Sequence, residues 1–108
     1  MNISKADAVA HLAKWHDKGT PVRAVYATIT GNLSLVGKIS ELSHASIKIT
    51  GSGCEMLFYF RETSTFAYKD PREALTEANK DRVNKYPTVI EAKFGNGDHV
   101  EITEYFNQ

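Results

Sequence analysis

The chain has 108 residues, of which 42% are hydrophobic and 24% are charged, and its thirteen basic and thirteen acidic residues cancel. This length suits one domain, which we place at residues 1–108, and no apolar run approaches the ~18 residues of a membrane-spanning helix. Proteins that neutralise many phosphates usually carry a basic excess, so the balanced charge argues against tight, non-specific binding to nucleic acid.

The N-terminal segment predicts a helix at about Lys5–Lys18. Ser4 followed by Asp7 fits an N-cap with a carboxylate near the exposed N–H groups of the first turn. Gly19 fits the position after the last turn, and Pro21 cannot continue a helix. The segment contains no apolar block ending at a small-residue cleavage site, so we expect a cytoplasmic protein and no signal peptide.

The next segment changes to the two-residue period of β-strands. Five short strands are expected at Val22–Thr30, at Leu33–Leu42, from Ile47, at Cys54–Phe60 and at Ser64–Tyr68. Gly37 stands in the middle of the second strand, where a glycine permits a sharp bend or a close backbone approach. Short connections between the strands favour a small, highly curved antiparallel sheet or barrel.

The C-terminal part predicts a short helix and a hairpin. Pro71–Lys85 carries good helix formers with a thin apolar stripe. Val89–Phe94 and Val100–Tyr105 flank Gly95-Asn96-Gly97-Asp98, a strong turn signal. We therefore expect a core at residues 4–70 and an extension at residues 71–108, whose hairpin packs on its own barrel or on a neighbouring one.

The order of a helix, five short strands and a central glycine in the second strand resembles the Sm-like superfamily, which includes Sm and LSm proteins and bacterial Hfq. The central glycine of the first Sm motif matches Gly37, and its hydrophobic positions match Ile39, Leu42, Ile47 and Ile49. In the second motif, Tyr59 and the Ser64-Thr65 pair agree with Hfq. The resemblance implies a mainly β (α+β) fold, with an N-terminal helix on a five-stranded, strongly bent antiparallel sheet or small open barrel.

The resemblance also implies a homo-oligomeric ring. In Sm-like rings the fourth strand of one subunit pairs with the fifth strand of the next, which here are residues 56–60 and 64–68. Neither segment contains a lysine, a proline or another device that blocks an exposed strand edge. We therefore expect the chain to be its own partner.

RNA is the ligand that the family implies, and the candidate RNA-binding residues are Arg61, His44, Ser43, Ser46 and Tyr59. Arg61 would contact phosphate or a base edge, His44 would stack or donate, and the serines would hydrogen-bond. The loop from Ser43 to Ser46 lacks the Asp and Asn of the family, however, and Glu62 follows Arg61. An ion pair within the loop or between subunits is therefore an equal interpretation of Arg61, and His44 is more often a solvated turn residue.

The chain shows no pattern of a catalytic, cofactor or metal site, and we expect a protein that is not an enzyme. His11 and His16 are five residues apart and diverge on a helix, while His99 has only Asp98 beside it. The first functional hypothesis is an Sm-like ring that binds RNA at its pore-side loops. The alternative is a ring or barrel that serves only as a protein-interaction and assembly module, and a barrel that binds a small molecule comes third.

Overall fold

The computed structural model describes residues 1–69 and 88–105. Every strand within these residues belongs to one antiparallel sheet, in the order β1-β6-β7-β8-β2-β3-β4-β5. The elements in chain order are β1 (Asn2–Ile3), α1 (Lys5–Lys18), β2 (Pro21–Thr28), β3 (Gly31–Leu42), β4 (Ser46–Gly51), β5 (Cys54–Tyr59), β6 (Thr65–Lys69), β7 (Val89–Lys93) and β8 (His99–Glu104). The fold is mainly β, as expected. Strands β1 and β5 lie at the two ends of the sheet, so the sheet does not close into a barrel.

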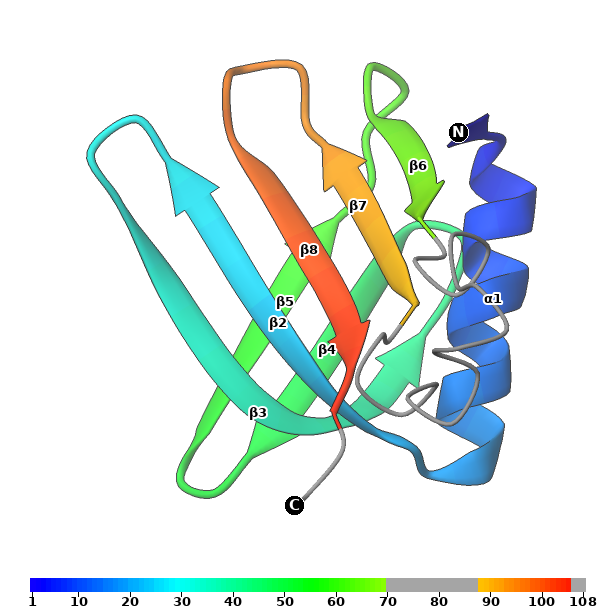
Figure 1. Ribbon diagram of the computed structural model, residues 1–108, viewed down its shortest axis with the longest axis vertical. Coiled ribbons are helices and arrows are strands. Elements are labelled where there is room, and N and C mark those ends of the chain that lie inside the picture. The colour runs from blue at the N-terminus through cyan, green and yellow to red at the C-terminus, as the bar shows by residue number, and fades with distance from the viewer. Residues whose placement is uncertain (70–87, 106–108) are drawn as a thin grey trace, which may run out of the picture.

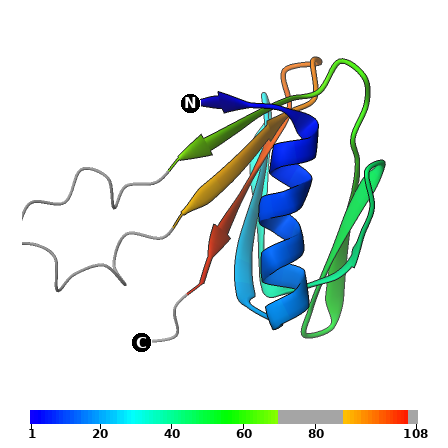
Figure 2. The same ribbon diagram turned by 90° about the vertical axis from the view of Figure 1, so that its right-hand side faces the viewer.

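Helix α1 has the predicted bounds. The Ser4 hydroxyl accepts a hydrogen bond from the Asp7 N–H at 3.1 Å, and Gly19 ends the helix in the left-handed conformation with φ of 63°. Its buried face consists of Ala8, Leu12 and Trp15. Because α1 packs against β3, β6 and β7, it covers the opening between the two halves of the curled sheet (Figure 2). No helix in residues 1–69 and 88–105 has the length and apolar character that a bilayer crossing requires.

The sheet curls because β3 is strongly bent, so that β4 and β5 lie behind β2 and β8 (Figure 1). At the bend Gly37 faces Gly51 across the β3–β4 pair, and the register shifts between Ile39 and Glu41. A Cβ on Gly37 would overlap the backbone carbonyl of Thr50, so this position requires a glycine. The predicted role of Gly37 in a close backbone approach is confirmed.

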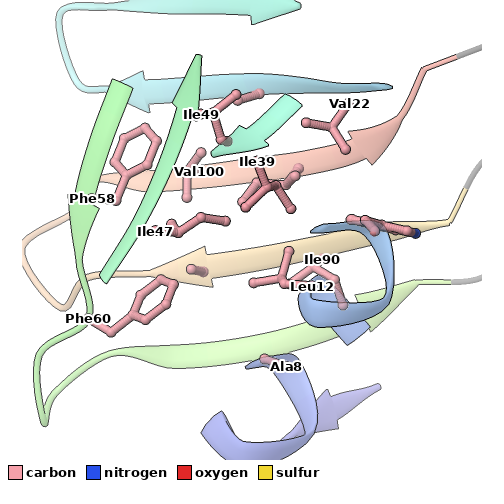
Figure 3. Close-up of a cluster of buried hydrophobic side chains, with 14 of the residues drawn as sticks. Ala8, Leu12, Val22, Ile39, Ile47, Ile49, Phe58, Phe60, Ile90 and Val100 are labelled. Atoms are coloured by element: carbon pink, nitrogen blue, oxygen red, sulfur yellow. The ribbon is translucent and has the colours of Figure 1, made fainter. Parts of the chain in front are cut away.

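The core lies between the two halves of the curled sheet and α1 (Figure 3). Its largest fully buried side chains are Leu12, Ile47, Ile49, Ile90, Ile102, Val22 and Val100. They come from α1 and from the concave face of the strands, where alternate residues point inward.

Two expectations about the sheet were wrong. The sheet has eight strands rather than five, because β1 and the C-terminal hairpin also belong to it. The hairpin of β7 and β8 packs on its own sheet, as one expectation allowed, but it lies inside the sheet, where β8 pairs with β2 and β7 pairs with β6. It is therefore not an extension beyond the core. The helix expected at Pro71–Lys85 lies outside the described residues.

Candidate functional site: an open strand edge beside an aromatic groove

Among residues 1–69 and 88–105, strand β5 ends the sheet and pairs on one side only, with β4. The Phe60 N–H donates to the Ala45 carbonyl at 2.7 Å, and backbone groups of an antiparallel strand point alternately to its two sides. The N–H and C=O groups of Glu55, Leu57 and Tyr59 therefore point away from β4. We call this outward side of Cys54–Tyr59 the β5 edge.

The β5 edge carries exposed apolar side chains. Leu57 is 47% exposed and Tyr59 is 64% exposed, whereas Phe58 between them is buried in the core. The strand contains no lysine or proline, and its one charged residue, Glu55, forms an ion pair with Lys48 of β4 at 3.4 Å. Natural proteins usually protect exposed edges with such residues, so this edge is open to pairing.

A groove of about 290 Å³ runs beside the β5 edge and is lined by Tyr26, Leu57, Phe58, Tyr59, Arg61, Phe94 and Asn96. We call it the aromatic groove. The rings of Tyr26, Phe58 and Phe94 form one cluster, with centroids 5.5 to 6.2 Å apart. The cluster joins β2, β5 and the segment after β7, so the groove depends on the curl of the whole sheet.

The Tyr26 hydroxyl donates a 2.6 Å hydrogen bond to the Asp98 carboxylate, which joins β2 to the turn between β7 and β8. This hydrogen bond, together with burial and the negative charge of Asp98, raises the pKa of Tyr26 above its ordinary value of 10.0. The folded protein therefore holds the hydroxyl proton of Tyr26 more tightly than the unfolded chain does. The stabilisation by this bond is fully present below pH 10 and is lost as the pH rises through the pKa of folded Tyr26.

We expect Tyr26→Phe to lower the free energy of unfolding at pH 7 by about 1.5–3 kcal/mol, the usual contribution of a hydrogen bond to a charged group. The difference between the two proteins should shrink as the pH rises through the pKa of folded Tyr26, since the wild type then loses the same bond. Urea unfolding at pH 7 and above pH 10 measures both values. A constant difference across this range would contradict the assigned role of the bond.

Two of the five residues predicted from the sequence, Tyr59 and Arg61, line the aromatic groove. Of the other three, Ser43 and His44 lie in the β3–β4 turn, and Ser46 begins β4, where it pairs with Tyr59 at the end of β5. The Ser43 hydroxyl accepts hydrogen bonds from the N–H groups of residues 45 and 46, at 3.1 Å each, so it serves the turn itself. His44 is exposed.

Five residues that line the groove were not predicted as site residues from the sequence: Tyr26, Leu57, Phe58, Phe94 and Asn96. They come from β2, from β5 and from the segment after β7, and they carry no common motif. The only usable signal was the run of apolar residues on β5 that contains Leu57 and Phe58, which indicated an interface but not a groove.

A polar cluster lies on the convex face of β7 and β8, apart from the aromatic groove. In it the potential metal-ligand atoms of Glu91, His99 and Glu101 are within 4.8 Å of one another. The sequence did not show this cluster because it depends on the pairing of Glu91 with Glu101. Lys69 already lies 3.3 Å from Glu91 and 3.8 Å from Glu101. Burial opposes the ionisation of Glu91, but the hydrogen bond and charge of Lys69, a hydrogen bond with Glu101 and the charge of Lys93 together outweigh it and lower the pKa of Glu91. Lys69 and Lys93, whose ammonium group lies 3.8 Å from Glu91, together balance the two negative charges that a metal ion would otherwise neutralise.

The chain was also compared with known proteins. The Sm-like resemblance rests on the sequence motifs alone, because the comparisons with family models, with curated proteins and with solved structures all found no match.

Proposed function

We propose that this chain is a protein-interaction module that accepts a β-strand from a partner on the β5 edge. The observation that carries the proposal is the row of outward backbone groups on Glu55, Leu57 and Tyr59. Main-chain hydrogen bonds to such a row supply affinity, and the exposed side chains beside it supply specificity. Leu57 and Tyr59 would provide apolar contacts on the convex face, and the aromatic groove would take a side chain on the concave face.

This proposal departs from the head-to-tail ring implied by the sequence. The expected second contact strand, residues 64–68, does not have an open edge, because β6 pairs with β7 on one side and with β1 on the other. The Tyr68 N–H also donates to the Met1 carbonyl at 2.9 Å. A ring that joins β5 to β6 would therefore require β1 to leave the sheet, so the proposal uses the β5 edge alone. An Sm-like ring and a cytoplasmic location remain sequence predictions.

A displayed library of extended peptides, each seven residues long with randomised side chains, tests the proposal. We expect selected peptides to bind and to slow the amide hydrogen exchange of Glu55, Leu57 and Tyr59, which NMR follows residue by residue. Leu57→Pro should abolish binding because it removes one outward N–H and leaves the bonds to β4 intact. Ile29→Lys is the matched control, since Ile29 is 90% exposed and lies in the β2–β3 turn.

Two results would overturn the proposal. One is a library that yields no peptide above background binding. The other is a set of bound peptides that leaves the exchange of all three outward amides unchanged.

Single-stranded RNA is a second candidate, favoured by the presence of Tyr59 and Arg61 in one groove. An exposed tyrosine provides a surface on which a base can stack, and an arginine can pair with phosphate. Titration with oligouridylate and oligoadenylate at low and moderate salt tests it. Binding that weakens with salt and is lost in Arg61→Ala would support RNA recognition, whereas no binding at low salt would exclude it.

A further inference from the structure

The open backbone groups of β5 are arranged so that the strand complements a second copy of itself. This inference depends on the proposed function, since both use the β5 edge. Glu55, Leu57 and Tyr59 are evenly spaced, with Leu57 at the centre. Two antiparallel copies related by a two-fold axis at Leu57 therefore pair all three residues of one chain with all three of the other.

Shifting the axis by one residue loses part of this pairing. An axis at Phe58 would place Glu55 opposite Arg61, whose N–H and C=O are already bonded to the hydroxyl and N–H of Ser64, each at 3.0 Å. An axis at Met56 would place Tyr59 opposite Gly53, which has φ of 78° in the β4–β5 turn and is not extended. The axis at Leu57 is the one of these three that uses every outward group of β5.

The side chains match in the same register. On the convex face Leu57 meets Leu57 of the second copy, and Tyr59 lies opposite Glu55, whose carboxylate can accept from the tyrosine hydroxyl. Arg61 is diagonal to that carboxylate, within reach of a long side chain. On the concave side Met56 lies opposite Phe58, a favourable pairing of a thioether with an aromatic ring. No two like charges face each other.

We infer that the partner of the β5 edge is a second copy of this chain, joined in a symmetric dimer with its two-fold axis at Leu57. The sheet of each copy continues into the other, and both β5 edges are covered at once. A two-fold contact of this kind is complete with two copies, whereas a head-to-tail contact closes only as a larger ring, and it leaves β1 paired with β6 in both copies.

Sedimentation equilibrium over a wide range of protein concentration tests whether the dimer forms. Leu57→Lys would place two like charges next to each other on the axis, and we expect it to raise the dissociation constant by about 30-fold or more, as for a central interface residue. Ile29→Lys adds the same charge away from β5 and should change the constant by less than about two-fold. Similar weakening by both variants would overturn the inference.

A nitroxide label at residue 52 tests the register, in a Ser52→Cys variant that also carries Cys54→Ser. With the axis at Leu57 the two labelled positions are ten residues apart along the paired strands, or about 33 Å, as measured by pulsed electron paramagnetic resonance. Axes at Met56 and Phe58 would give about 26 Å and about 40 Å, and either distance would overturn the register.

The two proposals fail in different ways. A chain that stays monomeric at millimolar concentration, while peptides still protect the outward amides, would overturn the dimer and leave the strand-accepting function in place. A chain that shows neither a dimer nor peptide binding at this edge would overturn both.

Discussion

Gly37→Ala is expected to lower the free energy of unfolding by about 3 kcal/mol or more, at the upper end of the range for overpacking, or to prevent folding. The added Cβ would overlap the carbonyl oxygen of Thr50 and lie 2.9 Å from the Cα of Gly51. Both neighbours are backbone atoms of β4, so no side-chain rotation relieves the overlap. Relief requires β3 and β4 to separate at the bend, where the curl of the sheet depends on their approach.

Gly31→Ala is the matched control for this experiment. Gly31 begins β3, and nothing lies within 4 Å of the position that its Cβ would take. The substitution should change the free energy of unfolding by less than about 1 kcal/mol and can stabilise the fold by restricting the unfolded chain. Urea unfolding of both variants measures the contrast, and equal effects would show that β3 and β4 tolerate separation at Gly37.

Ile102→Ala is expected to lower the free energy of unfolding by about 3 kcal/mol, within the range for truncation of a fully buried isoleucine. Ile102 is 1% exposed and lies between Ile90 of β7 and Ala24 of β2. The effect would show that β8 is part of the core. If the hairpin lay outside the core, the same truncation would lower the free energy of unfolding far less.

Thr103→Ala on the same strand is the control for Ile102→Ala. It distinguishes the effect of losing a buried side chain from the effect of any substitution in β8. Thr103 points to the convex face, opposite Arg23 and Val89, and is only partly buried. We expect a loss below about 1 kcal/mol, the span of strand propensities. Thermal unfolding followed by circular dichroism compares the two variants. A loss for Ile102→Ala no larger than that for Thr103→Ala would contradict the central position of the hairpin.

Local features of this fold could be predicted from the sequence. The bounds of α1 follow from Ser4 and Gly19, whose roles as caps depend only on neighbouring residues. The turn at Gly95 and Gly97 was also predictable, because glycine readily adopts the positive φ that such a turn needs. In the structure both glycines do so, with φ of 86° and 95°. These features depend on interactions within a few residues of the chain.

The order of the strands could not be predicted in the same way. Nothing in the sequence of β8 indicates that it pairs with β2 rather than lying outside the core, because alternating apolar residues such as Val100 and Ile102 suit any buried strand. The two-residue β1 is too short to give a periodic pattern. The resemblance to five-stranded Sm-like proteins also led us to end the core at residue 70.

The candidate site was predictable only where its residues are close in sequence. Tyr59 is the last residue of β5 and Arg61 comes two residues later, so a single sequence motif could include both. The part of the aromatic groove outside β5 comes from β2 and the segment after β7, which the curl of the sheet brings to β5. The apolar character of β5 on both faces did indicate an interface, and the exposure of Leu57 and Tyr59 agrees with that interpretation.

The position of β8 beside β2 also bears on how the chain reaches its native state. During synthesis, strands β2 to β5 emerge in order and can pair with their neighbours through short turns. β6 follows them and can pair with the two-residue β1, but it cannot join strands β2 to β5 until β7 and β8 exist, because these two strands separate it from β2. Until residues 99–104 leave the ribosome, β2 keeps an unpaired apolar side, a state in which chains aggregate. We therefore expect the closing step of folding to be the late insertion of the β7–β8 hairpin, and pauses in translation before it to lower the yield of folded protein.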